Sequence, residues 1–181
     1  ADATAATVET TYNALGQAVV VKDANGNYSY KVYDNLGNVQ AEIDQERNVT
    51  TYLYDAWNDQ TRLLRYAAKL NTGATAFTGA NWQAGQPIGW AQIVAGVDNN
   101  DAQNRVITSA YDALGRKTQV TLSQVSYVRS NGTTANGSPT TRYAYNAYGE
   151  TVKESVLLEG SPDQVDAVWA DTWRYYDAAG R

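Results

Sequence analysis

The sequence predicts an all-β protein in which antiparallel β-hairpins follow one another along the chain as a meander ribbon. Three observations lead to this prediction. A short turn motif recurs six times, the segments between its copies alternate in polarity, and the composition suits strands joined by turns. The chain has 14 Tyr and 5 Trp against a single Phe, together with 14 Gly. Aromatic and β-branched residues favour strands, whereas glycine serves turns.

The recurring motif is a tyrosine followed by aspartate or asparagine, two variable residues, and then glycine or asparagine. The first three copies follow one another at a spacing of 21 residues, and we interpret the longer later spacings as the same unit carrying insertions. The motif residues are Tyr12, Asn13 and Gly16; Tyr33, Asp34 and Gly37; Tyr54, Asp55 and Asn58; Tyr111, Asp112 and Gly115; Tyr145, Asn146 and Gly149; and Tyr176, Asp177 and Gly180.

Each position of the motif has a physical role in a hairpin turn. The side chain of aspartate or asparagine can accept a hydrogen bond from a backbone N–H further along and so close the turn. Glycine three residues later suits a type I turn followed by a bulge residue with positive φ. In the third copy this position is Asn58, the residue type that next best tolerates positive φ.

A second kind of turn lies midway between the tyrosine motifs. Residues 23–26 (Asp-Ala-Asn-Gly) follow the same rules, whereas residues 44–47 (Asp-Gln-Glu-Arg) lack the glycine. The segments between turns, such as 17–22 and 27–33, are long enough for strands of roughly 20 Å. Each 21-residue unit is therefore predicted to be two strands.

The strand that enters the second tyrosine motif alternates in a way that suits a sheet. Tyr28, Tyr30 and Val32 share one face, and Tyr33 lies on the other. Because the pattern recurs in the next unit, we expect tyrosine ladders across neighbouring strands.

The chain is predicted to be a single repeat array and a fragment of a longer polypeptide, since it lacks methionine. Three regular repeats occupy residues 1–65, an insertion occupies 66–105, and three further repeats with lengthened hairpins occupy 106–181. Within the insertion, residues 71–89 suggest an excursion or loop, and 88–97 suit either a short helix or a strand. We expect Trp82 and Trp90 to pack the insertion onto the sheet.

Two further insertions lengthen the later hairpins. Residues 120–129 and 140–145 are expected to form a long hairpin whose tip, 130–139, is mobile. Ser161 followed by Pro162 resembles the start of a helix and predicts one or two helical turns to about Ala170.

The composition argues against several classes of function. The chain has no His and no Cys, so it lacks the commonest general base, the commonest metal ligand and any thiolate. A net charge of −5 argues against nucleic acid as a partner, and no apolar run reaches the roughly 20 residues of a membrane span. A weak calcium candidate, residues 98–101 (Asp-Asn-Asn-Asp), lacks the full loop signature. We expect no catalytic residue, no cofactor and no metal.

Residues 111–116 (YDALGR) and 176–181 (YDAAGR) resemble the YD-repeat, or Rhs, family. The resemblance covers nearly the whole chain apart from 66–105. The family includes bacterial Rhs toxins, shell subunits of insecticidal toxin complexes, and animal teneurins. It implies a β-ribbon wound into a hollow shell, which in toxin members encapsulates a toxic polypeptide. The family's self-cleaving core, with Asp-Pro elements, has no counterpart here, because Pro87, Pro139 and Pro162 do not follow aspartate.

The resemblance therefore implies a structural role, as a wall segment of a secreted or surface-exposed bacterial shell. Its partners would be the rest of its own polypeptide or an encapsulated toxin, and unpaired strand edges are expected to favour self-association. The alternative is a glycan-binding or adhesin module, in which Trp82 and Trp90 would contact a sugar. Against it, the motif tyrosines are more simply explained by packing within the sheet.

Overall fold

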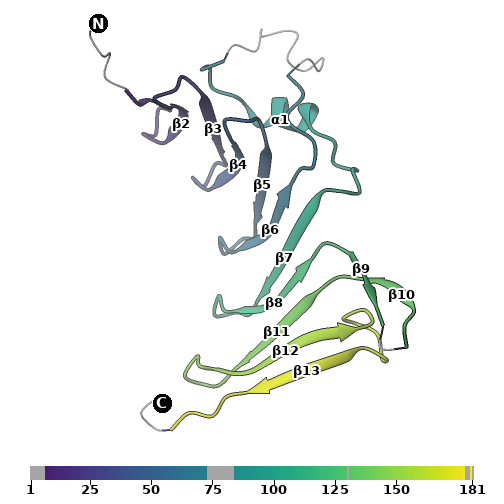
Figure 1. Cartoon of the computed structure of the whole chain (residues 1–181). Coiled ribbons are helices and arrows are strands. Elements are labelled where there is room, and N and C mark those ends of the chain that lie inside the picture. The colour runs from purple at the N-terminus through teal and green to yellow at the C-terminus, as the bar shows by residue number, and fades with distance from the viewer. Residues whose placement is uncertain (1–6, 73–83, 130, 178–179, 181) are drawn as a thin grey trace, which may run out of the picture. The chain divides into compact units, whose positions relative to one another are not determined.

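The computed structural model describes residues 7–72, 84–129, 131–177 and 180, and in this part the chain is almost entirely antiparallel β-structure (Figure 1). Eleven strands form one sheet in the order β1-β2-β3-β4-β5-β6-β7-β8-β11-β12-β13, and β9 pairs with β10 separately. The predicted fold class, a hairpin meander, is confirmed.

The strands and the helix follow the chain from the N-terminal side in a simple order. Their bounds are β1 Glu9–Tyr12, β2 Ala18–Lys22, β3 Tyr28–Tyr33, β4 Val39–Ile43, β5 Val49–Tyr54, β6 Gln60–Arg65, α1 Trp90–Gly96, β7 Arg105–Tyr111, β8 Lys117–Leu122, β9 Val125–Val128, β10 Thr134–Gly137, β11 Thr140–Tyr145, β12 Thr151–Glu159 and β13 Val168–Trp173.

The chain divides into two compact units. The first unit comprises residues 1–52 and 64–104, and the second comprises 53–63 and 105–181. Each unit has its own packing.

The core of the first unit lies on one face of the sheet. Val20, Tyr30, Ile43 and Val49 are cross-strand partners on β2 to β5, and each is at most 3% exposed. The described residues of the insertion after β6 cover this face and add the buried hydrophobic side chains of Tyr66, Leu70, Ile88 and Ile93. Burial of this apolar surface is the main stabilising contribution to the unit.

Residues 88–97, for which the sequence left helix and strand open, contain helix α1. The insertion is attached to the sheet by two tyrosines of β3. The backbone N–H of Gly85 donates to the hydroxyl of Tyr30 at 3.0 Å, and a Cβ at Gly85 would lie 2.9 Å from the Tyr28 ring. Trp90, the first residue of α1, is half-buried, and Trp82 lies outside the described residues.

In the second unit, polar contacts hold the segment that covers one face of the sheet. Thr140 and Ser155, which share one face of the sheet, are buried and carry hydroxyl groups. The described residues of this unit include no buried hydrophobic side chain. Arg142 lies on the same face and donates to the carbonyl of Pro162 at 3.0 Å and to Asp163 at 3.1 Å. The loop after β12 thus covers this face by hydrogen bonds.

The prediction of helical turns after Ser161 is wrong. Residues 162–166 form successive turns, and strand β13 begins at Val168. The backbone N–H of Gln164 bonds the carbonyl of Ser161, and its side chain accepts from the Ser161 N–H. These hydrogen bonds between Ser161 and Gln164 are complete within a single turn. The chain after this turn pairs with β12 and forms strand β13.

The mobility expected of the tip at 130–139 stays a prediction, but the described residues there include a further strand. Thr134–Gly137 form β10, which pairs with β9. The turn between them is closed by hydrogen bonds from the N–H of Arg129 to Thr133 and from the N–H of Gly132 to Arg129.

The expected tyrosine ladder across neighbouring strands does not form at β3. The cross-strand partners of Tyr30 are Val20 and Ile43, and Tyr30 stacks instead with Tyr28 of its own strand. Each repeat contributes two strands, so equivalent tyrosines lie two strands apart, too far for direct ring contact.

The positive φ at Gly37 gives a direct test of the turn geometry. Gly37 has φ of 90°, and a Cβ there would lie 3.3 Å from the side chain of Gln17. We expect Gly37→Val to lower the free energy of unfolding by more than about 1 kcal/mol, because a β-branched residue resists this conformation. Urea unfolding followed by tryptophan fluorescence measures the change. Leu36→Val, at an exposed position of the same turn, is the control, and equal effects of the two substitutions would contradict the prediction.

Candidate functional site in the repeat turns

In the described repeat turns before residue 150, the acidic or amide side chain accepts hydrogen bonds from two backbone N–H groups. The Oδ1 atom of Asp34 accepts from the N–H of Leu36 at 2.9 Å and of Asn38 at 2.8 Å. The same pair of bonds forms at Asn13, Asp23, Asp44, Asp55, Asp112 and Asn146. These two hydrogen bonds stabilise the conformation of the turn.

The backbone of these turns is equally uniform. The N–H of Asp34 donates to the carbonyl of Asn38, and the carbonyl of Asp34 accepts from the N–H of Gly37. The residue at the position of Gly37 has positive φ in every turn, including Arg47 at 71° and Asn58 at 73°. The turn at 44–47 therefore forms without glycine, with a conformation that is strained for arginine.

The turns that follow a motif tyrosine (tyrosine turns) are followed by a β-bulge. The turns at 23–26 and 44–47, which have no motif tyrosine (plain aspartate turns), are not. Tyr33 pairs with Val39, but Val32 pairs with Ala41, so the outgoing strand carries one extra residue. The same shift occurs at Tyr12, Tyr111 and Tyr145. At the turn of Asp23 the register continues without a shift.

Four motif tyrosines each link their own hairpin to the one before it. The Tyr33 hydroxyl donates to the carbonyl of Ala18 at 3.0 Å, and Ala18 is the bulge partner of Tyr12. The same bond joins Tyr111 to Gln60, Tyr145 to Lys117 and Tyr176 to Thr151, at 3.0, 2.6 and 3.0 Å. In each case the acceptor lies six residues after the preceding motif tyrosine. Because a bulge disrupts the local ladder, the hydroxyl supplies a partner to a carbonyl at that position.

Side chains just after the turns add lateral contacts between neighbouring turns. The Gln17 side-chain amide donates to the carbonyl of Gly37 at 3.2 Å. Arg116 donates to the carbonyl of Asn146 at 3.2 Å and lies 4.7 Å from the centre of the Tyr145 ring. Its guanidinium also pairs with Asp112 at 2.7 Å. The turns therefore hold one another in register.

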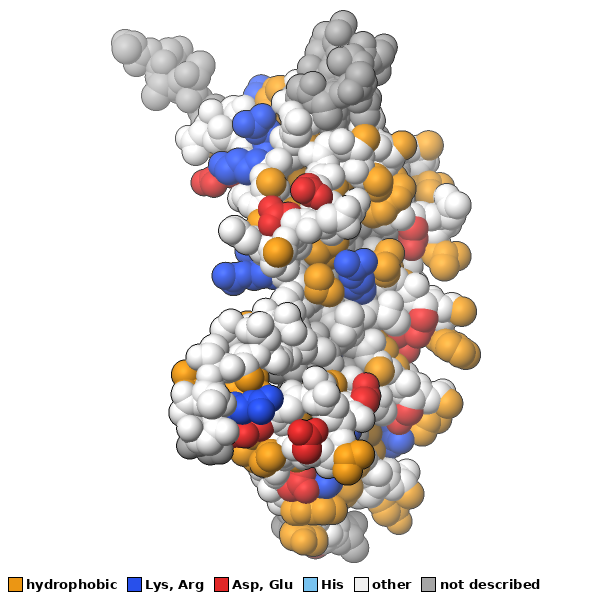
Figure 2. All heavy atoms as spheres, turned by 90° about the vertical axis from the view of Figure 1, so that its right-hand side faces the viewer, with side chains coloured by type: hydrophobic (Ala, Val, Ile, Leu, Met, Phe, Trp, Pro, Cys, Tyr) orange, Lys and Arg blue, Asp and Glu red, His pale blue; other side chains and the backbone are white. Residues whose placement is uncertain are grey.

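The tips of the tyrosine turns carry large exposed apolar side chains. These are Leu15, Leu36, Trp57, Leu114 and Tyr148, which are 76–90% exposed. The space-filling view shows how hydrophobic side chains lie among polar and charged ones on the face in view (Figure 2). Scattered exposed apolar residues are common on proteins, so the tips alone do not mark a binding site.

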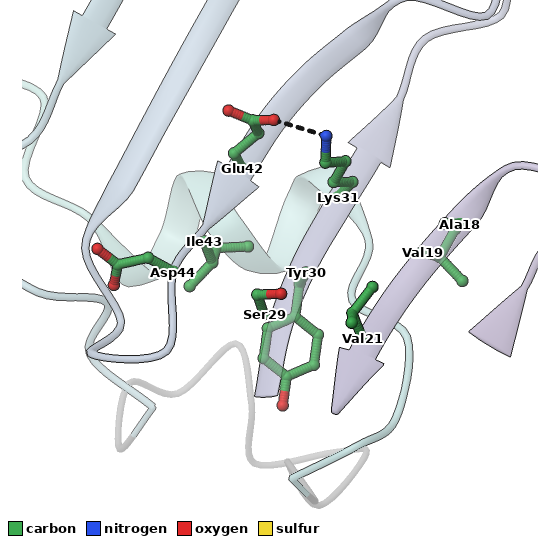
Figure 3. Close-up of a pocket in the computed structure, with 9 residues that line it drawn as sticks. All are labelled: Ala18, Val19, Val21, Ser29, Tyr30, Lys31, Glu42, Ile43 and Asp44. Atoms are coloured by element: carbon green, nitrogen blue, oxygen red, sulfur yellow. Dashed lines mark ion pairs between the residues drawn. The ribbon is translucent and has the colours of Figure 1, made fainter. Parts of the chain in front are cut away.

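The described residues also include a pocket of about 220 Å³ beside strands β2, β3 and β4 (Figure 3). Lys31 and Glu42 form an ion pair of 2.9 Å there, and Tyr52 donates to Glu42 at 2.8 Å. Partial burial disfavours the charge of Glu42, but the bonds from Lys31 and Tyr52 outweigh it and hold the pKa of Glu42 below its ordinary value. The charged groups of Lys31 and Glu42 are thus paired with each other.

The oxygen atoms of residues 98–101 are used within the protein. Asp98 accepts from the N–H of Asn100, Asp101 from the N–H of Gln103, and Asn99 from the Tyr66 hydroxyl. Within the described residues, no cluster of three or more acidic side chains is placed to hold a metal ion. The described part of the chain likewise contains no helix long and apolar enough to cross a membrane.

Four of the turn aspartates, Asp23, Asp34, Asp44 and Asp112, are stabilised in their charged form. Hydrogen bonds from the backbone N–H of Asn27 and of Arg116, the largest cause in each case, hold the pKa of Asp23 and Asp112 below its ordinary value. At Asp34, partial desolvation acts against the charge, and the bonds from Asn38, Leu36 and Gly37 outweigh it, so its pKa is also lowered.

Comparison with known proteins gives a match of fold. No family model matches the chain, and no curated protein matches it. The crystal structure of TcdB2-TccC3-Cdc42 is similar over 96% of the chain, with a TM-score of 0.55 and 13% identity. The structures of TcdB2-TccC3 and TcdB2-TccC3-TEV match at TM-scores of 0.26 and 0.22, with 15% and 12% identity over 90% and 96% of the chain, which is too low to argue a shared fold. The chain spans 6%, 10% and 11% of the three matched chains.

The hydroxyl of Tyr33 provides a test of the link between hairpins. We expect Tyr33→Phe to lower the free energy of unfolding by about 1 kcal/mol, because the Ala18 carbonyl loses its partner while the ring remains. Chemical denaturation measures the change, and Tyr148→Phe, at a 90% exposed tip, is the matched control. Equal stability of Tyr33→Phe and the wild type would show that the hydroxyl contributes nothing.

The lowered pKa values of Asp23, Asp34, Asp44 and Asp112 predict a loss of stability in acid. A carboxylate whose folded pKa is lowered contributes stability that is present above its unfolded pKa and is lost as pH falls through the folded pKa. We expect the urea midpoint to fall below about pH 4. Asp34→Asn should weaken this pH dependence, and Asn13→Asp, at the equivalent position of the preceding turn, should strengthen it. Parallel pH profiles for both variants and the wild type would contradict the role of the turn carboxylates.

Proposed function

We propose that this chain is a wall segment of a bacterial YD-repeat shell, of the kind found in Rhs and toxin-complex proteins. The wall would enclose or display another polypeptide, as part of a secreted or surface-exposed protein. The observation that carries the proposal is the repeated bond from a motif tyrosine to the preceding hairpin, seen at Tyr33, Tyr111, Tyr145 and Tyr176. Such nearest-neighbour links allow a sheet to be extended repeat by repeat.

The two faces of the sheet differ in each unit, as a wall requires. In the first unit the insertion covers the face of Tyr30 and Val32, opposite to that of Tyr33. In the second unit the loop after β12 binds Arg142, on the face opposite to Tyr145. In both units the added segments thus lie on the face away from the motif tyrosines. The fold shared with TcdB2-TccC3-Cdc42 also supports the proposal.

The proposal gives the chain no catalytic role. The turn carboxylates, such as Asp34 and Asp112, each accept two backbone hydrogen bonds, and these bonds are needed to close the turns. The partner would be the remainder of the same polypeptide or an enclosed toxic segment.

Protease protection in the full-length protein tests enclosure. We expect the polypeptide inside the wall to resist protease in the wild type and to be cut when Thr50→Pro interrupts the ladder of β4 and β5. Ala24→Pro is the matched control, because proline suits the second position of a type I turn. Equal cleavage of the inner polypeptide in the wild type and Thr50→Pro would show that the wall does not enclose it.

A glycan-binding module is the second candidate, and an exposed tryptophan favours it. Trp173 of β13 is 56% exposed, and Lys153, itself paired with Asp171 at 2.8 Å, lies 5.0 Å from its ring centre. An aromatic ring beside polar side chains is a suitable surface for stacking on a sugar. Saturable binding on a glycan array that is lost in Trp173→Ala, but kept in Trp57→Ala, would favour this candidate. A wild-type protein that binds no glycan would eliminate it.

A further inference from the structure

Large apolar side chains recur at one position of the tyrosine turns, two residues after the aspartate or asparagine. In the second unit they are Trp57, Leu114 and Tyr148, which we call the tip row, and each is 76–90% exposed. Leu15 and Leu36 occupy the same position in the first unit and are also highly exposed. Burial within the described part of the chain therefore does not account for the apolar character of this position.

The chemistry of the turn does not account for it either. The plain aspartate turns and the turn between β9 and β10 have the same backbone hydrogen bonds and the same positive φ as the tyrosine turns. At the equivalent position these other turns carry the polar residues Asn25, Glu46 and Asn131. Because polar residues serve the same turn equally well, the apolar tips indicate contact with another molecule.

The three turns that carry the tip row lie side by side. A Cβ at Gly115 would lie 3.6 Å from a carboxylate oxygen of Asp59, which brings the first turn next to the second. The guanidinium of Arg116 donates to the carbonyl of Asn146 at 3.2 Å, which brings the second turn next to the third. Successive hairpin turns are two strands apart, so the tips recur about every 10 Å along the row.

The turns of the tip row carry more negative than positive charge. Asp55 and Asp59 in the first turn and Glu150 after the third take part in none of the ion pairs of the described residues. In the middle turn, Asp112 is paired with Arg116 at 2.7 Å. The row therefore presents apolar side chains with unpaired carboxylates at both ends, which is complementary to an apolar surface flanked by cations.

We propose that the tip row is a docking surface for an amphipathic α-helix of another polypeptide, with lysine or arginine beside its apolar stripe. Apolar residues that recur every seven positions of a helix are about 10.5 Å apart, which matches the spacing of the tips. The helix covers the three tips and places its cations next to Asp59 and Glu150. A second copy of this chain fits less well, because two facing rows would bring acidic turns together.

A designed peptide tests the proposal. The probe is a fluorescently labelled amphipathic helix of three heptads, with leucine at the first and fourth positions and lysine at the flanking positions. The comparison peptide has glutamate in place of each lysine. Fluorescence anisotropy measures binding to the 181-residue chain. We expect saturable binding of the lysine peptide and an affinity about tenfold lower for the glutamate peptide, because its charges repel the acidic turns.

Two pairs of variants separate docking at the tip row from general attraction to an acidic protein. Leu114→Ser should weaken binding of the lysine peptide about tenfold, whereas Val165→Ser, at a fully exposed position in the loop after β12, should not change it. Asp59→Asn should weaken binding roughly threefold, whereas Asp166→Asn removes the same charge from the loop after β12 and should have no effect. An unchanged urea midpoint of Leu114→Ser shows that the variant still folds.

Three results would overturn the proposal. The first is an equal affinity of the wild type and Leu114→Ser for the lysine peptide, or no binding by either. The second is a dimer of the chain that forms with rising concentration and is lost in Leu114→Ser, which would assign the row to a second copy. The third is co-sedimentation with phosphatidylcholine vesicles that is lost in the same variant, which would assign it to a lipid surface. None of these results affects the protease-protection test of the proposed function, because that test does not involve the tip row.

Discussion

The bond from a tyrosine hydroxyl to a bulge carbonyl is the interaction on which the repeat architecture depends. A bulge lets the tight turn join two twisted strands, but it interrupts the ladder at one residue. At Ala18, Lys117 and Thr151 the next hairpin supplies a donor for the carbonyl. Phenylalanine would pack as well but could not donate, which explains why tyrosine is the abundant aromatic residue. Each hairpin is therefore completed only by its successor.

Much of the fold could be predicted from sequence because its turns are determined locally. Asp34 and Gly37 lie within one turn, and their chemistry is almost independent of the rest of the protein. Predictions failed where strand pairing outweighed a local signal. Ser161 and Pro162 have the form of a helix start, yet the pairing of β13 with β12 decides the conformation after Ala167. The short apolar run 88–97 could not be assigned, since neither helix nor strand periodicity shows in so few residues.

The contacts of the site were harder to predict than its residues. The motif tyrosines were found by their spacing, but sequence reasoning gave them only a packing role. Their acceptors lie far away in the chain, as with Tyr111 and Gln60, and the bulge that positions the acceptor leaves no mark in the sequence. The excess of tyrosine over phenylalanine was the available signal for a hydroxyl-dependent role. Trp90, a candidate because it belongs to the insertion and not to the repeat, lies in α1.

The two units reach stability by different means. The buried hydrophobic side chains, such as Ile43 and Ile93, all lie in the first unit. In the described residues of the second unit, the sheet is held by ladder bonds, turn bonds and cation–π contacts, including Arg142 over Trp169. Each contact of this kind contributes little to stability. Such a sheet therefore gains stability from every neighbouring hairpin that pairs with its edge strand and donates a hydrogen bond to its free carbonyl groups. Continuity along the ribbon therefore replaces a large core as the source of stability.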